Sequence, residues 1–180
     1  MPYSLDVTEG TYHFGPTEGQ MHLKIWKDGM LSRLGHDLTL GFSGYSLVST
    51  VESGGESARF ELSIPRSSFV VLEPSSMMDT MKREVLQNIE KHLPGDIHVE
   101  GTLQSISAAE IKLQATARLN GRQTPLSMHC RLQGGRLTGS TKLTHKQFHI
   151  KPFKAPLGVL KIKDEMDFSF SFVWPEPQAG

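Results

Sequence analysis

Hydrophobic and polar residues alternate one by one over most of this chain of 180 residues, which is the period of half-buried β-strands. The last run is the longest: every second residue from Leu160 to Trp174 is hydrophobic except Asp164, which a bulge near the strand start would turn outward. Shorter runs occupy residues 20–27, 36–48, 58–64, 97–103, 111–119, 126–132 and 137–143. The pattern predicts antiparallel strands joined by hairpins, with Asn120-Gly121 as the strongest turn signal.

One stretch departs from this alternation and predicts a helix over about residues 76–93. Its apolar residues recur at steps of three and four and form one stripe, made of Met78, Met81, Val85, Leu86, Ile89 and Leu93. Two serines after Pro74 are expected to cap the first turn, and Pro94-Gly95 to end the last one. A single amphipathic helix must cover a sheet surface, so we expect it at the mouth or open face of a barrel.

These elements predict an all-β fold, an antiparallel barrel of about eight strands with one amphipathic helix. The length fits a single domain over residues 1–180. A barrel of about eight strands either fills its centre with side chains or holds one small ligand. The alternating residues leave both readings open.

The composition excludes several classes of function. Lys and Arg number 19 and so do Asp and Glu, which gives no net charge to attract nucleic acid. Cys130 is the only cysteine, so neither an internal disulfide nor a multi-cysteine metal site is expected. No transmembrane segment or signal peptide is expected either, which favours a cytoplasmic protein as written, or a periplasmic one if an export signal has been removed.

Motifs for catalysis are missing from the sequence: it contains no phosphate-binding loop, dinucleotide loop, nucleophile elbow or metalloprotease helix. His145 and His149 resemble a metal pair, but on a strand this spacing would place them about 13 Å apart, and only a helix or tight loop there would bring them together. His22, His98 and His129 fall on the polar faces of their strands. We therefore expect a binding protein rather than an enzyme, with no resident metal or cofactor.

His36 is the exception among the histidines, because it shares the face of Leu40 and Phe42. It is either a rim histidine bonded to a backbone carbonyl or, with Arg33, a polar contact for the head group of a ligand. In the second interpretation the ligand's apolar tail would lie between the helix and the last strand. The candidate ligand-binding residues are then Arg33, His36, Leu40, Phe42, Met81, Val85, Ile89, Phe168 and Phe170.

Four stretches in a fixed order resemble a known bacterial family. They are residues 34–38 with Gly-His-Asp, the helix with residues 92–101, the hairpin at 119–126, and residues 144–153 followed by 160–166 with Leu-Lys-Ile-Lys-Asp-Glu-Met. They span about residues 20–173 and resemble the YceI-like family of lipocalin-like, polyisoprenoid-binding barrels. His149 stands where that family has glycine, and Val99 where an aromatic residue is usual.

The resemblance implies a carrier for an isoprenoid, such as an isoprenoid quinone, or for another amphiphilic lipid. Two alternatives come from other classes. One is a haem- or metal-dependent barrel that senses or catalyses through His36. The other is an assembly role, in which unpaired edge strands recruit a second subunit and form a homodimer.

Overall fold

The computed structural model describes residues 5, 7–28, 37–93, 95–119, 121–151 and 161–174. The described residues form strands and one α-helix, with short 3₁₀ turns at η2 (Arg66–Ser68) and η3 (Lys146–Phe148). The elements are β1 (Gly10–Phe14), β2 (Gly19–Asp28), β3 (Leu38–Phe42), β4 (Ser46–Val51), β5 (Ser57–Ile64), β6 (Phe69–Glu73), α1 (Asp79–His92), β7 (Ile97–Ser105), β8 (Glu110–Leu119), β9 (Arg122–Gln133), β10 (Arg136–Thr144) and β11 (Lys161–Val173).

All the strands belong to one antiparallel sheet of eleven, in the order β1-β4-β5-β7-β8-β9-β10-β11-β2-β3-β6. β3 and β4 lie toward opposite ends of this order, yet only a corner at residues 43–45 separates them in the chain. At that corner the Ser43 amide and hydroxyl both donate to the Ser68 carbonyl oxygen, at 2.7 and 3.0 Å. The corner curls the sheet into a half-barrel, which confirms the predicted all-β, barrel-like class.

The strand number differs from the predicted eight because single runs of the sequence bend. The run over residues 36–48 was expected to be one strand with a bend or bulge permitted by Gly41 and Gly44, and it breaks at the corner into β3 and β4. In β11 the predicted bulge is present: the register with β2 shifts between Ile162 and Met166, and Asp164 is exposed. Alternation marks which residues share a face, but it does not reveal where a strand turns.

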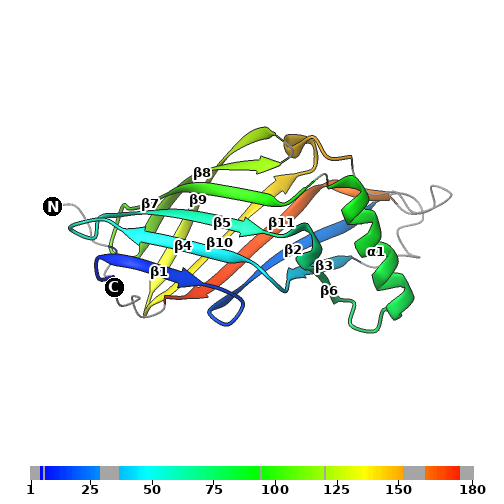
Figure 1. Ribbon diagram of the computed structural model, residues 1–180, viewed down its shortest axis with the longest axis horizontal. Coiled ribbons are helices and arrows are strands. Elements are labelled where there is room, and N and C mark those ends of the chain that lie inside the picture. Colours follow the sequence, from blue (N-terminus) through cyan, green and yellow to red (C-terminus); the bar gives the residue numbers. More distant parts are fainter. Residues whose placement is uncertain are drawn as a thin grey trace.

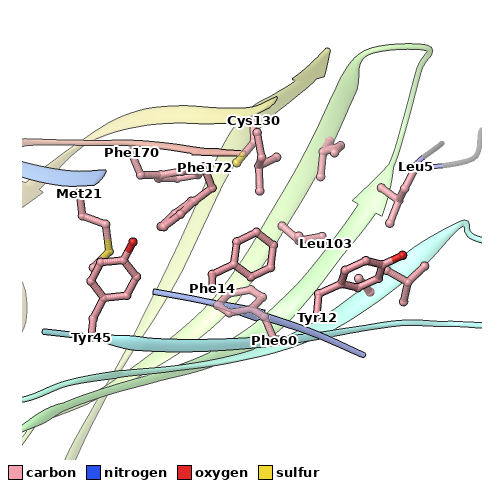
Figure 2. Packing of buried hydrophobic residues seen from close by; sticks show 14 of the residues in the cluster. Leu5, Tyr12, Phe14, Met21, Tyr45, Phe60, Leu103, Cys130, Phe170 and Phe172 are labelled. Atoms are coloured by element: carbon pink, nitrogen blue, oxygen red, sulfur yellow. The ribbon is translucent and has the colours of Figure 1, made fainter. Parts of the chain in front are cut away.

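The strands run along the length of the molecule, and α1 lies at one end of it beside β3 and β6 (Figure 1). We call this the helix end and the opposite one the far end. Two buried clusters follow the same division. Figure 2 shows the larger cluster, in which Phe14 and Tyr45 both pack against Phe172 and Tyr12 lies farther along toward Leu5. The smaller cluster belongs to the helix end and comprises Ile25, Leu40, Phe69, Leu93, Leu119 and Met166.

The helix differs from its prediction at the first turn. It begins at Asp79 with Met78 as N-cap, and no side chain caps it, so the serines predicted as caps do not serve. No residue within α1 is buried, and Met78 and Met81 are 66% and 50% exposed. At the other terminus the Arg66 guanidinium donates to the carbonyl oxygen of Leu93 at 3.1 Å. The apolar stripe therefore meets the barrel through its second half, where Leu86, Ile89 and Leu93 pack.

Candidate ligand-binding site

A cavity of about 350 Å³ lies inside the half-barrel. Its lining is almost entirely apolar and comes from the helix, the 3₁₀ turn η3 and most of the strands. At the helix end the lining includes Val85, Ile89 and Leu93, and at the far end Phe14, Phe172 and Trp174. The middle is formed by residues such as Phe60, Leu62, Leu103, Met166, Phe168 and Phe170. The size and lining are those of a small-molecule site, because such pockets measure about 300 to 1,000 Å³ and are mostly apolar.

Close packing between β10 and β11 shapes one wall of the cavity. Gly139 lies directly opposite Phe170 in the ladder. A Cβ atom added at Gly139 would lie 2.6 Å from Cζ of Phe170 and 3.0 Å from the methyl carbon of Met128. Glycine at this position therefore lets the Phe170 ring lie against the neighbouring strand.

The far end is closed by side chains that pack beyond the cavity. Tyr12, Val51, Ala58, Ile111 and Cys130 are buried and do not line it. Burial raises the pKa of Cys130 to about 12, so its thiol stays protonated and unreactive near neutral pH. This end of the half-barrel is a packed plug.

Tyr45 lies at the corner between β3 and β4, on the side of the larger cluster away from Tyr12 and Leu5 (Figure 2). Its ring makes an edge-on contact with Phe172 at 5.9 Å between centroids. Its hydroxyl lies 2.7 Å from the Gly15 carbonyl oxygen and 2.8 Å from that of Gly19. Burial, and then the nearby Glu18 carboxylate, raises the pKa of Tyr45 to about 12.

Polar lining residues gather at the helix end. Asn88 and His92 come from α1, and Lys142, His145, Gln147 and Lys151 come from β10 and the turn after it. His145 is only 6% exposed, and its Nδ1 lies 2.9 Å from the Asp164 carbonyl oxygen. A carbonyl oxygen only accepts, so Nδ1 is the donor in this hydrogen bond. The helix end therefore offers hydrogen-bonding groups around an apolar interior.

The structure brings most of the predicted binding residues to this cavity. Its lining includes Leu40, Phe42, Val85, Ile89, Phe168 and Phe170. Met81, expected to touch the ligand's tail, points to solvent in the first half of the helix and does not line the cavity. Arg33 and His36 lie outside the described residues, so the predicted head-group contact and the His36-dependent haem or metal alternative both stay predictions.

The sequence did not predict the polar lining residues at the helix end, among them His145, or the buried serine in the cavity wall. His145 and His149 were placed on a strand, but they flank the 3₁₀ turn η3, so the distance argument against a metal pair used the wrong geometry. Even so, the described residues contain no group of three or more His, Cys, Asp or Glu side chains that could hold a metal ion.

Ser49 was not predicted to line the cavity because the corner at residues 43–45 changes which alternate positions face inward. Leu38, Leu40 and Phe42 line the cavity at even positions, whereas Leu47 and Ser49 line it at odd ones. The glycines at 41 and 44 were the available signal for that bend.

Comparisons with known proteins support the fold but do not indicate a function. No family model matches the chain, and no curated protein matches it. The crystal structure of Burkholderia cenocepacia BcnA is similar, with a TM-score of 0.59 and 10% sequence identity over 84% of this chain and 94% of that one. Among the described residues, no helix has the length and apolar character needed to cross a membrane. At this identity the likeness establishes a shared fold alone, an all-β barrel-like architecture with one helix.

Proposed function

We propose that this protein binds an apolar or amphiphilic lipid inside the half-barrel. The observation that carries the proposal is the cavity of about 350 Å³ with its almost wholly apolar lining. Cores without a binding role are close-packed, with few voids larger than a water molecule. An apolar wall of this extent loses the stabilisation that burial and packing bring for as long as it faces water or empty space. An apolar occupant offsets that loss.

The distribution of polar groups favours the helix end as the side from which a ligand enters. Asn88, His92 and Gln147 border the cavity there, and no residue within α1 is itself buried, so the helix is held less tightly than the strands. At the far end Tyr12, Val51 and Ala58 close the interior. A ligand would thus pass beside α1 and run toward Phe172.

Membership of the YceI-like family, and with it an isoprenoid or isoprenoid quinone as ligand, is part of this proposal. One local feature supports it. His149, which replaces the family's glycine, has φ 57° and ψ 35°, the left-handed conformation that glycine adopts most readily. The substitution is therefore compatible with the backbone that the family's glycine would favour.

The test begins with the protein purified from a host that makes isoprenoid lipids. Native mass spectrometry followed by solvent extraction is expected to reveal a lipid in stoichiometric amount, and the emptied protein is expected to bind an isoprenoid quinone in titration. A protein that carries no lipid and does not respond to quinones contradicts the proposal.

A pair of variants on one strand locates the binding. Ala115 lines the cavity, and Gln114 beside it on β8 is exposed on the outer face. Ala115→Phe is expected to fill the cavity and abolish lipid binding, whereas Gln114→Phe adds a similar ring outside and should leave binding unchanged. Equal effects of the two variants would mean that the ligand lies elsewhere.

A further inference from the structure

Two buried polar atoms in the cavity lining have no hydrogen-bond partner. They are Oγ of Ser49 and Nε1 of Trp174, and among the residues that the structure describes nothing pairs with either. Ser49 is 1% exposed, and both residues line the cavity. Buried polar groups in native proteins are nearly always bonded, so an unpaired pair in an otherwise apolar wall requires an explanation. The other indole shows the usual arrangement, because Nε1 of Trp26 donates to the Asp167 carboxylate at 2.9 Å.

Both atoms belong to the far half of the molecule. Ser49 on β4 lies directly opposite Tyr12 on β1, and opposite residues of an antiparallel pair project to the same face. The Trp174 ring packs edge-on against Tyr12 and Phe14, with centroids 5.6 and 5.2 Å apart. Ser49 and Trp174 thus both lie beside Tyr12, away from α1.

The chemistry of the two groups defines what would satisfy them. An indole N–H only donates, and a serine hydroxyl can donate as well. One oxygen with two lone pairs, such as a carbonyl oxygen, accepts from both. The cationic side chains in the described lining, Lys142 and Lys151, belong to the helix end. A carboxylate or phosphate at the far end would be buried without a counter-charge, which is strongly unfavourable, so the accepting group must be neutral.

The geometry points to a carbonyl-binding subsite at the far end of the cavity, in which Ser49 and Trp174 donate to the neutral carbonyl oxygen of an amphiphile that enters carbonyl first. This inference rests on the proposed function, because it assigns the orientation and chemical class of a ligand in the same cavity. It differs from the orientation predicted from the sequence, in which the head group lies near Arg33 and His36.

The test uses three probes of equal chain length: methyl nonyl ketone, undecane and undecanoate. The indole N–H resonances of nitrogen-labelled protein report on the subsite, with Trp26→Phe used to assign them. The ketone is expected to shift the Trp174 resonance downfield and to leave that of Trp26 in place, since Trp26 is already bonded. Undecane should bind without that shift, and undecanoate should bind more weakly than the ketone.

Variants test whether the two donors contribute to ketone affinity beyond the apolar lining of the cavity. Ser49→Ala and Trp174→Phe are each expected to lower ketone affinity about fivefold to tenfold, the effect of one buried hydrogen bond, while undecane affinity stays unchanged. Headspace gas chromatography measures both volatile probes. Ser68→Ala is the control, because it removes a buried hydroxyl that does not line the cavity and should leave ketone affinity unaltered.

The outcomes test the carbonyl subsite separately from the lipid-binding function on which it rests. If none of the three probes binds, the proposed lipid-binding function fails and the subsite fails with it. If ketone and undecane bind equally and the Trp174 resonance does not move, the cavity binds apolar molecules but the carbonyl subsite is wrong. Tighter binding of undecanoate than of the ketone also overturns it, because the subsite requires a neutral group.

Discussion

The two ends of the half-barrel are built differently. At the far end, rings interlock edge-on, as Phe14 and Phe172 do with centroids 5.8 Å apart, and the plug behind them is buried. At the helix end, α1 lies over the sheet with no buried residue of its own and with Met78 exposed. The far end therefore carries much of the packing energy, and the helix end is free to adapt. A binding barrel needs both properties, because a rigid interior preserves the cavity while a loosely held cover admits the ligand.

The largest expected effect is the loss of an aromatic ring at the far end. Phe172 is 4% exposed and packs against Phe14, Tyr45 and Phe170. Phe172→Ala should lower the free energy of unfolding by about 3 to 5 kcal/mol. Met81→Ala is the matched change at the helix end, where the side chain is half-exposed, and it should shift stability by less than about 0.5 kcal/mol. Urea unfolding measures both. Similar losses for the two variants would mean that the ends are equally packed.

Alkaline pH should have the next largest effect, because it weakens the packing of Tyr45 beside Phe172. The pKa of Tyr45 is raised from 10.0 to about 12, chiefly by burial, so the native state holds the phenol proton more tightly than the unfolded chain does. The stabilisation is fully present below about pH 10 and is lost as pH rises through 12, by about 2 to 3 kcal/mol in all.

Urea titrations across that window check this prediction. Cys130 has a raised pKa in the same range, so Cys130→Ala serves as the background for every measurement. Adding Tyr45→Phe should flatten the pH dependence. If the slope persists in that double variant, another group causes it.

The next largest effect on stability is expected from replacing one of two buried serines. Near the helix end, Ser68 donates from its hydroxyl to the Pro65 carbonyl oxygen at 2.8 Å, whereas the Ser49 hydroxyl on the cavity wall is unpaired in the described structure. Ser68→Ala should cost about 1 kcal/mol in the ligand-free protein, and Ser49→Ala should cost nothing or slightly stabilise, because it removes an unsatisfied buried group. Thermal unfolding of the two variants provides the measurement. A clear loss for Ser49→Ala would show that its hydroxyl is bonded.

The sequence predicted the straight strands better than the bends and turns, for a physical reason. In a straight strand the alternation gives the buried face directly, and Phe168, Phe170 and Phe172 all line the cavity as their parity predicts. A bend breaks that rule, which is why Ser49 was missed beyond the corner of β3 and β4.

At the helix end the available signals were weaker still. An amphipathic stripe tells which face of a helix is apolar but not how much of its length reaches the sheet, so Met81 was placed inside. The buried position of His145 depends on the turn after β10 and on its bond to the Asp164 carbonyl, and no local pattern encodes such a contact.

The smallest expected effect is a gain, and it lies at the helix end. His149 ends the 3₁₀ turn η3 in the left-handed conformation, where a side chain costs about 1 kcal/mol relative to glycine. His149→Gly removes that strain, but glycine also loses more conformational freedom on folding, so the net gain should be a few tenths of a kcal/mol. His129, exposed on the extended strand β9, is the control, since His129→Gly brings only the entropic loss and should destabilise by about 0.5 to 1 kcal/mol. Opposite signs in urea unfolding support a left-handed backbone at 149. A loss for both variants would mean that the turn beside the cavity takes another conformation in solution.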